Sequence, residues 1–311
     1  MESTKTRILK KLLETDGYLS GQELCEQLGV SRTAVWKYMK QLKEEGYEIE
    51  AVQNKGYCLK DVPDVLGESE IKSRLHTRWA GQTLYYYDEI DSTNTQIKRL
   101  AEEDAPHGTL AVADYQSRGK GRRGRAWDSP HGSAIYMSIL FRPEIRPDRA
   151  SMLTLVIGLS VTQAIRSNLG LQAQIKWPND VVLNGKKLVG ILTEMSAQMN
   201  YIEYLVTGIG INANLREFPE ELERNNYLEA VCDRYHKATS LQKEIGHKVN
   251  RSALIAECME KIEENYEIFV KTQDLSGLMA AYQEALVNQD QQVRVLEPGH
   301  EYPGVARGIN A

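Results

Sequence analysis

Residues 176–192 read KWPNDVVLNGKKLVGIL. Two short apolar runs flank the pair NG at residues 184–185, and this pair favours the tight turn of a β-hairpin. Pro178 fixes the backbone just before the first run, so Asn179 and Asp180 can be held in a defined direction. The stretch therefore predicts an antiparallel hairpin that presents polar groups at one end.

Other apolar segments surround this hairpin in the sequence. Four of them are extended and typical of strands: residues 83–90, 110–115, 134–141 and 204–210. Residues 152–169 are apolar enough to form a largely buried helix. Together these segments predict an α+β domain over residues 66–287, with a central mixed β-sheet and flanking helices.

The first sixty residues follow a different plan. Apolar residues at helical spacing predict three short helices. Ser20 and Ser31 stand where the second and third helices would be capped, and Gly29 stands where the second would end. Residues 47–59 alternate around a turn, which predicts a β-hairpin wing. The pattern predicts a winged helix-turn-helix domain over residues 1–62, whose third helix would enter the DNA major groove.

The third predicted helix has a basic outer face that suits contacts with DNA phosphates and bases. The candidate DNA-binding residues are Ser31, Arg32, Thr33, Trp36, Lys37, Lys40 and, in the wing, Lys55. Residues 1–61 nevertheless hold ten Lys or Arg and ten Asp or Glu, and the whole chain has a net charge of −5. A monomer is therefore expected to bind DNA weakly. A helical interaction domain with solvated lysines is the alternative.

A basic loop follows the strand predicted at residues 110–115. Residues 116–125, QSRGKGRRGR, combine five positive charges with three glycines and no acid. The glycines let backbone N–H groups approach a ligand, and the cations supply counter-charge for a phosphate or carboxylate. The loop is neither a Walker loop nor a GxGxxG loop followed by an acid. It predicts an anion-binding loop, and a solvated basic loop or nucleic-acid patch is the alternative.

Polar residues and glycines also stand at the ends of other predicted strands. Residues 92–94, Ser-Thr-Asn, occupy a strand-to-helix junction where they could bind a polar ligand, although N-capping by Ser92 explains them equally well. Lys187, at the start of an apolar strand, is either a partly desolvated cation or a solvated strand-end lysine. Gly208 and Gly210 leave room for a ligand beside the last strand.

The bulk composition is that of a soluble globular protein, with 41% hydrophobic and 26% charged residues. Four cysteines, at positions 25, 58, 232 and 258, form no CxxC pair and have no histidine at metal-ligand spacing. They predict reduced structural thiols and no protein metal site. Since the sequence begins without an apolar signal region and has no run of 18 apolar residues, we expect a cytoplasmic protein with no membrane partner.

Several motifs occur in a characteristic order behind the winged domain: the basic loop, KWPND at residues 176–180, GxKLxGIL at 185–192 and GIGINxN at 208–214. In this order they resemble the bifunctional biotin–protein ligases of the repressor type, over residues 6–310. The resemblance implies a class II synthetase-like ligase domain. That domain would use ATP and Mg²⁺ to form biotinyl-5′-AMP and then biotinylate the carboxyl carrier protein of acetyl-CoA carboxylase. The resemblance also implies repression of biotin biosynthesis and transport genes by an adenylate-bound homodimer on operator DNA.

The same resemblance assigns roles to individual residues. Biotin contacts are expected from Ser92, Thr93, Asn94, Gln116, Lys120, Gly121, Arg122, Lys187 and Gly190. ATP contacts are expected from Arg122, Arg125, Trp127, Asn179, Lys187 and Asn212. Lys187 and Arg122 would supply the positive charge for catalysis, and Asp180 is a hypothetical general base for the acceptor lysine. Lys120 replaces the arginine usual at its place, and Arg118 stands where a small residue is common.

Two other functions remain open from the sequence. A lipoate–protein ligase would have a similar catalytic fold and would also form an acyl adenylate. The winged domain, together with the pairing of KWPND and the basic loop, favours biotin. A biotin-sensing regulator without catalysis would keep the ring pocket but lack the cations near the phosphate, and Lys187, Arg122 and Asn179 argue against it.

The C-terminal residues 288–311 depart from the family pattern, in which a small SH3-like β-barrel completes the nucleotide site. Strands are predicted at residues 292–296 and 304–309, with a turn at residues 298–299. These give at most a hairpin, which is marginal alone. We therefore expect an incomplete remnant of the barrel, with biotin binding retained and ATP use weakened.

Overall fold

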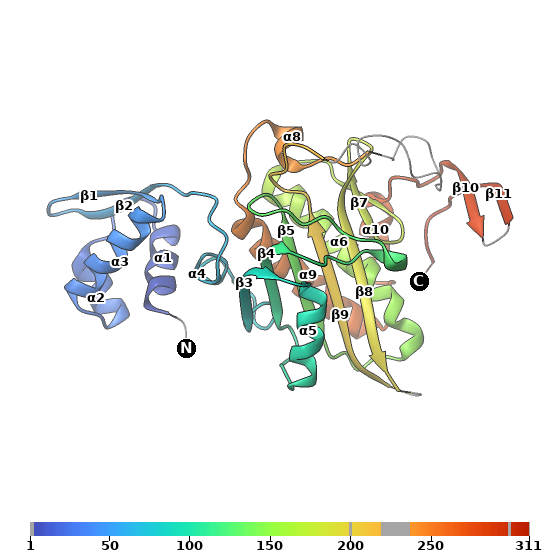
Figure 1. The fold of residues 1–311 in the computed structure, drawn as a ribbon, viewed down its shortest axis with the longest axis horizontal. Coiled ribbons are helices and arrows are strands. Elements are labelled where there is room, and N and C mark those ends of the chain that lie inside the picture. The colour runs from blue at the N-terminus through green and yellow to red at the C-terminus, as the bar shows by residue number, and fades with distance from the viewer. Residues whose placement is uncertain (1–2, 199–200, 219–236, 298–299, 311) are drawn as a thin grey trace. The chain divides into compact units, whose positions relative to one another are not determined.

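The computed structural model describes residues 3–198, 201–218, 237–297 and 300–310. Contacts divide the chain into two compact units. The first comprises residues 1–76 with residues 250–256, and the second comprises residues 77–249 with residues 257–311. The ribbon in Figure 1 labels the helices and strands of both units.

The first unit is a winged helix-turn-helix domain, as predicted (Figure 1). Its elements are α1 (Thr4–Glu14), α2 (Gly21–Leu28), α3 (Arg32–Glu44), β1 (Glu48–Val52), β2 (Gly56–Asp61) and α4 (Glu68–Lys72). The Ser20 hydroxyl accepts the Glu23 N–H at 3.0 Å, and Ser31 caps α3 in the same way. Gly29 ends α2 in the left-handed conformation, with φ of 65°. The caps therefore stand where the sequence predicted them.

The wing is joined to the helical core by its second strand. The backbone of Tyr57 exchanges two hydrogen bonds with Leu19, at 2.8 and 2.9 Å. Gly56 permits this close approach, because a Cβ there would lie 2.1 Å from the Leu19 carbonyl oxygen, and its φ is 111°. Ile49 is buried, whereas Ala51, two residues farther along β1, is exposed. The alternation of buried and exposed residues along β1 therefore stops after Ile49.

The described part of the second unit contains a seven-stranded mixed sheet in the order β3-β4-β5-β9-β8-β7-β6. The strands are β3 (Leu84–Ile90), β4 (Leu110–Gln116), β5 (Ile135–Phe141), β6 (Gln174–Lys176), β7 (Asp180–Leu183), β8 (Lys186–Ala197) and β9 (Ile202–Ile211). The pair β3–β4 is parallel and the other neighbours are antiparallel. The predicted α+β class and the hairpin at residues 180–192 are confirmed, although β8 begins at Lys186 and is longer than predicted.

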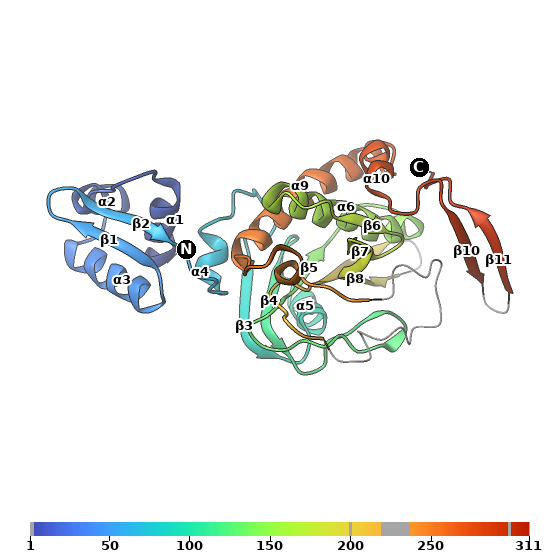
Figure 2. The same ribbon diagram turned by 90° about the horizontal axis from the view of Figure 1, so that it is seen from above.

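Helices lie on both faces of this sheet, α5 on one face and α6, α9 and α10 on the other (Figure 2). Their bounds are α5 (Thr93–Glu102), α6 (Ala150–Leu169), α9 (Arg251–Thr272) and α10 (Met279–Ala285). The short helix α8 (Leu241–Ile245) and 3₁₀ turns at Arg122–Gly124 and Pro147–Arg149 lie in the connections. Ile97 and Leu100 of α5 pack on Leu140 and Val206, while α6 lies on the opposite face.

The helix α6 forms part of the core. The segment Pro147–Leu169 is long and apolar enough to cross a membrane by length and composition alone, but 61% of its apolar window is buried inside the unit. Val156, Ile157 and Ile165 have no exposed surface. This burial is the packing expected of a core helix, as the sequence predicted.

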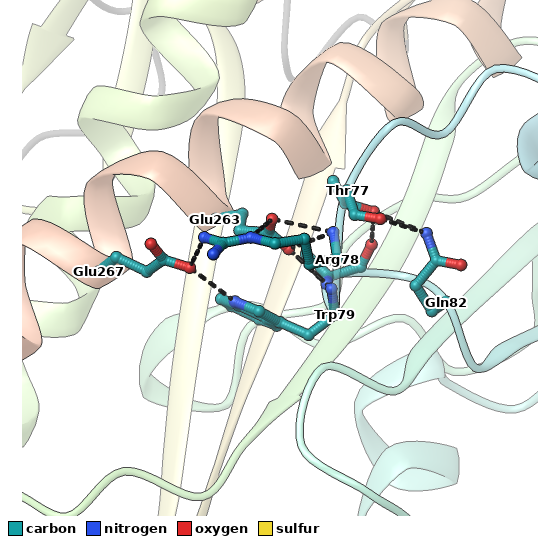
Figure 3. Close-up of polar contacts among 7 residues, drawn as sticks. Thr77, Arg78, Trp79, Gln82, Glu263 and Glu267 are labelled. Carbon is teal, nitrogen blue, oxygen red and sulfur yellow. Dashed lines mark hydrogen bonds and ion pairs between the residues drawn. The ribbon is translucent and has the colours of Figure 1, made fainter.

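A buried carboxylate fastens the start of the second unit to α9 (Figure 3). Glu263 accepts the backbone N–H groups of Arg78, Trp79 and Ala80 at 2.8 to 3.0 Å, and the Arg78 Nε–H at 3.3 Å. The neighbouring Glu267 accepts from the Arg78 guanidinium and the Trp79 indole. Burial alone would raise the pKa of Glu263, but the three backbone donors outweigh it and hold that pKa below its ordinary value.

The C-terminal segment forms one antiparallel hairpin, β10 (Gln292–Glu297) with β11 (His300–Val305). The second strand was predicted at residues 304–309, which is wrong: Glu297 pairs with His300, so β11 starts directly after a two-residue connection. That connection, residues 298–299, lies outside the described residues. Tyr302 and Val305 are exposed.

Replacing the buried carboxylate should destabilise the second unit. In Glu263→Gln one side-chain oxygen becomes an NH₂ group facing backbone donors, which should lower the free energy of unfolding by about 2 kcal/mol at neutral pH. The difference from wild type should narrow as the pH falls below about 4.5, because protonation then removes the same acceptor in the wild type. Thermal unfolding across this pH range measures both effects.

Glu267→Gln is the matched control, since its carboxylate binds the same segment but is more exposed. It should cost at most about 1 kcal/mol. Equal losses in the two variants would contradict the clamp role of Glu263.

Candidate functional site

A pocket that is partly open to solvent lies on the α5 face of the sheet, beside the N-terminus of that helix. Its wall includes the helix N-terminus and the basic loop, through Ser92, Thr93, Asn94, Gln116, Lys120, Gly121, Arg122 and Trp127. The turn before β7 contributes Asn179, and the sheet contributes Tyr136, Met137, Lys187, Gly190, Ile191, Leu192, Gly208, Ile209 and Gly210. The pocket therefore combines an apolar floor with polar and cationic sides, as ligand pockets commonly do.

The floor is built on a pair of glycines. Gly190 of β8 and Gly210 of β9 are cross-strand partners, and the indole of Trp127 rests against both. A Cβ at Gly190 would lie 2.5 Å from Trp127 Cζ3, and one at Gly210 would lie 2.6 Å from Cε2. Within the described residues the buried Trp127 Nε1–H has no hydrogen-bond acceptor. The glycines thus admit the ring, and its donor is available to a polar ligand.

The basic loop folds back on itself. Gly121 N–H donates to the Arg125 carbonyl at 2.8 Å, and Trp127 N–H donates to the Gly119 carbonyl at 3.0 Å. Arg123 takes the left-handed conformation, with φ of 56°. This tight fold brings residues 120–122 to the pocket, whereas the exposed Arg125 is not part of its lining.

An irregularity in β8 aims Lys187 at the pocket. Asp180 pairs with Gly190 and Val182 pairs with Lys187, because the register shifts between Val181 and Val182. This shift accommodates one extra residue in β8, so Lys187 and Gly190 come to the same face although they are three positions apart. Lys187 Nζ lies 2.7 Å from Asp180 Oδ1.

A second contact joins the hairpin to the basic loop. Arg122 Nη1 donates to Asn179 Oδ1 at 2.6 Å, and Asn179 Nδ2 donates to Asp180 Oδ1 at 3.2 Å. Lys187 Nζ also lies 5.5 Å from the centroid of the Trp127 ring. Two cations, one carboxylate and one aromatic face therefore meet at this end of the pocket.

The opposite end is formed by the start of α5. Thr93 N–H donates to Gln116 Oε1 at 2.8 Å, and Gln116 Nε2 donates to the Ser129 hydroxyl at 3.0 Å. Ser92 occupies the N-cap position, but its side chain makes no capping hydrogen bond. N-capping by Ser92 therefore does not account for these polar residues, and the start of α5 lines the pocket.

The structure brings most of the candidate ligand-binding residues together. Those in the lining are Ser92, Thr93, Asn94, Gln116, Lys120, Gly121, Arg122, Trp127, Asn179, Lys187 and Gly190. Arg125, Asp180 and Asn212 are outside it, Asp180 as the partner of Lys187, and Asn212 with its backbone bonded to Leu188 and Leu241. Sequence reasoning missed Tyr136 and Leu192, which line the pocket beside Gly208 and Gly210, although the alternation of glycine with isoleucine at residues 208–211 was a usable signal for a bare strip of sheet at this place.

The candidate DNA-binding residues occupy the surface of the first unit. All seven are exposed: Ser31, Arg32, Thr33, Trp36, Lys37, Lys40 and Lys55. Trp36 keeps 60% of its surface accessible, which is unusual for so large an apolar side chain. Packing inside the unit therefore does not account for the presence of this tryptophan on α3.

The described residues hold no group of three or more His, Cys, Asp or Glu side chains that could bind a metal ion. Cys25, Cys58 and Cys258 carry free thiols, and Cys232 lies outside the described residues. Burial raises the pKa of the Cys258 thiol, which is a property of an unreactive structural cysteine.

Comparison with known proteins relates both units to a single family. A model of the biotin/lipoate A/B protein ligase family matches residues 86–212, and a helix-turn-helix domain model matches residues 4–58. The bifunctional ligase/repressor BirA of Bacillus subtilis is 42% identical over 274 residues, which cover 87% of this chain and 81% of that protein. The chain belongs to the bifunctional ligase/repressor family.

Other relatives of this family agree with the match. The bifunctional ligase/repressor BirA of Escherichia coli is 30% identical over 300 residues, covering 96% of this chain and 88% of that protein. Among solved structures, the biotin protein ligase of Aquifex aeolicus in complex with biotin and ATP aligns with a TM-score of 0.61 and 31% identity. That alignment covers 74% of this chain and 88% of the Aquifex chain.

Proposed function

We propose that this chain is an ATP-dependent biotin–protein ligase that also acts as a biotin-responsive transcriptional repressor. The observation that carries the proposal is one pocket whose polar end and cationic end share an apolar floor, in a chain of the ligase/repressor family. We assign DNA binding to residues 1–62, catalysis to residues 66–287 and a small β domain to residues 288–311.

Biotin fits the end of the pocket beside α5. Its ring carries polar ureido groups and an apolar thioether, and this end offers both polar and apolar neighbours. The proposed contacts are Ser92, Thr93, Asn94, Gln116, Lys120, Gly121, Arg122, Lys187 and Gly190. Leu192, the cross-strand partner of Gly208, supplies an apolar side chain on the pocket face of the sheet, and Gly208 and Gly210 leave the backbone bare beside it. The biotin carboxylate would then point toward the cations.

ATP fits the end where Lys187 and Arg122 meet. The proposed contacts are Arg122, Arg125, Trp127, Asn179, Lys187 and Asn212, and the Trp127 indole offers an aromatic face with an available N–H donor. Mg²⁺ enters as the counter-ion of the ATP phosphates. The two cations oppose the repulsion between the biotin carboxylate and the phosphates.

The first half-reaction is adenylation. A biotin carboxylate oxygen attacks the α-phosphorus of ATP, the bond to the bridging oxygen breaks, and pyrophosphate leaves. Lys187 and Arg122 stabilise the negative charge that gathers on the phosphoryl oxygens. The product is biotinyl-5′-AMP, a mixed anhydride that the basic loop shields from water.

The second half-reaction transfers biotin to the carboxyl carrier protein. A lysine amine of that protein attacks the acyl carbon, AMP leaves, and the amine loses a proton. An unperturbed lysine has a pKa of about 10.4, so a base or desolvation must assist. Asp180 is the proposed base. Since Asp180 holds Lys187 at 2.7 Å, this role requires the ion pair to open after adenylation.

Repression would use the first unit. We propose that biotinyl-5′-AMP promotes homodimerisation and that two copies of α3 then bind operator DNA. When two recognition helices are joined in a dimer, binding of the first raises the effective concentration of the second at the DNA. The dimer therefore has a higher DNA affinity than the charge-balanced monomer. We propose that a disordered-to-ordered change of the loop at residues 117–125 couples adenylate binding to dimerisation.

Incubation with ATP, Mg²⁺, labelled biotin and a biotin-acceptor domain tests the enzymatic proposal directly. Label should become covalently attached to the acceptor, with AMP and pyrophosphate released. Lipoate in place of biotin is the matched control and should give no transfer. Transfer of lipoate alone would replace the proposal by the lipoate ligase alternative.

Lys187→Ala should slow adenylate formation by on the order of 10²–10³, because it removes one preorganised charge from the phosphate end. Biotin-dependent pyrophosphate exchange measures this rate. Lys186→Ala is the matched control, since Lys186 pairs with Glu244 at 3.0 Å and does not line the pocket. Near-normal exchange by Lys187→Ala would contradict the assignment of Lys187.

Biotinyl-5′-AMP should raise operator affinity on the order of 10²-fold at fixed salt, with dimer appearing in sedimentation. Lys37→Ala should weaken DNA binding with and without the adenylate, and biotinylation should stay normal because Lys37 is an exposed residue of the first unit. Equal DNA affinity of the wild type in both states would refute the regulatory proposal.

A further inference from the structure

A chain of hydrogen bonds runs from β8 to the start of α5 behind the pocket wall. Asn94 Nδ2 donates to Glu194 Oε2 at 2.8 Å and, more weakly, to the Leu192 carbonyl at 3.3 Å. Asn94 Oδ1 lies 2.6 Å from Ser138 Oγ, which lies 2.7 Å from Thr93 Oγ1. Thr93 and Asn94 line the pocket, whereas Ser138 and Glu194 stand behind it.

Glu194 stands at one end of this chain of hydrogen bonds and, as an ionised carboxylate, has no hydrogen to donate. Lys98 Nζ lies 2.6 Å from Glu194 Oε1. Burial raises the pKa of Glu194, but the hydrogen bonds from Lys98 and Asn94 outweigh it and hold that pKa below its ordinary value. An ionised carboxylate only accepts hydrogen bonds. Asn94 must therefore turn its NH₂ group toward Glu194 and its Oδ1 away from it.

The direction of every other bond follows from that orientation. Asn94 Oδ1 only accepts, so Ser138 must give its single hydroxyl hydrogen to Asn94. Ser138 shares that hydrogen with Thr93 Oγ1, which it approaches to 2.7 Å, so Thr93 accepts from Ser138. Thr93 gives its own hydroxyl hydrogen to Gln116 Oε1 at 3.1 Å, and the same oxygen accepts the Thr93 N–H. Thr93 Oγ1 therefore has no hydrogen left for a ligand and can only accept from one.

We propose that Glu194 and Lys98 are positioning residues that make Thr93 a fixed hydrogen-bond acceptor for the substrate ring. The inference rests on the proposed function, because such an acceptor suits a ureido N–H of biotin. The dithiolane ring of lipoate has no N–H group and would leave the acceptor unpaired, which is costly in a buried site. Residues behind the wall would thus set the choice between the two cofactors.

Glu194→Gln tests the direction of the chain. The new amide has one oxygen, which can face either the Lys98 ammonium or the Asn94 NH₂ group, so its own NH₂ must oppose a donor on the other side. Biotin should bind about tenfold more weakly, as expected for the loss of one hydrogen bond. Calorimetry gives Kd and pyrophosphate exchange gives KM. The kcat and the KM for ATP should be unchanged.

A double variant separates direction from charge. In Lys98→Met with Glu194→Gln no ammonium competes for the glutamine oxygen, so that oxygen can face Asn94 and biotin affinity should return close to the wild-type value. Thr93→Val should weaken biotin binding itself and make Glu194→Gln cost nothing more. Glu203→Gln is the matched control, because Glu203 accepts from Ser196 and Gln198, each at 2.7 Å, and does not line the pocket.

Three outcomes would overturn the inference. One is unchanged biotin affinity in Glu194→Gln. Another is the absence of rescue in the double variant, which would mean that the charge of Glu194 matters and the direction of the hydrogen bonds does not. The third is an equal loss for biotin and ATP, which would indicate general damage to the pocket. Absence of biotin binding by the wild type would instead overturn the proposed function, and the inference with it.

Discussion

The contact between Trp127 and the facing glycines of β8 and β9 is the constraint on which the rest of the site depends. Side chains normally cover a sheet face, and Gly190 and Gly210 leave this part of it bare so that an indole can rest on the backbone. The basic loop is held beside that ring by the hydrogen bond from the backbone N–H of Trp127 to the Gly119 carbonyl. The absence of side chains at Gly190 and Gly210 thus lets the indole, and the loop cations beside it, lie close to the sheet at the pocket.

The two cations of the pocket are each held in place by a neighbouring polar side chain. Lys187 and Arg122 come from different segments, and each is held by a neighbour on the 179–180 turn, Lys187 by Asp180 and Arg122 by Asn179. The carboxylate of Asp180 and the amide oxygen of Asn179 reduce the repulsion between the two cations, so the cations can lie close together. One of them is then paired with a carboxylate. An incoming phosphate can compete for these cations because the pocket already directs them toward it.

Local chemistry explains which features could be predicted from the sequence. The caps Ser20 and Ser31, the αL residue Gly29 and the turn at residues 184–185 depend on a few neighbouring residues, and the structure has them where the pattern indicated. The face of Lys187 depends on a register shift against β7, which strand periodicity does not encode. Ser138 and Glu194 gain their roles from partners far along the chain, so no local signal marked them.

The Glu263 clamp joins residues that lie 183 to 185 positions apart. Closing so long a loop adds little to the equilibrium cost, because loop entropy grows only with the logarithm of length. It does bear on the order of folding, since contacts between distant residues form slowly. Residues 78–80, at the start of the second unit, therefore obtain their hydrogen-bond acceptor only after α9 has packed. During synthesis this segment must wait for the last third of the chain before it can take its final structure.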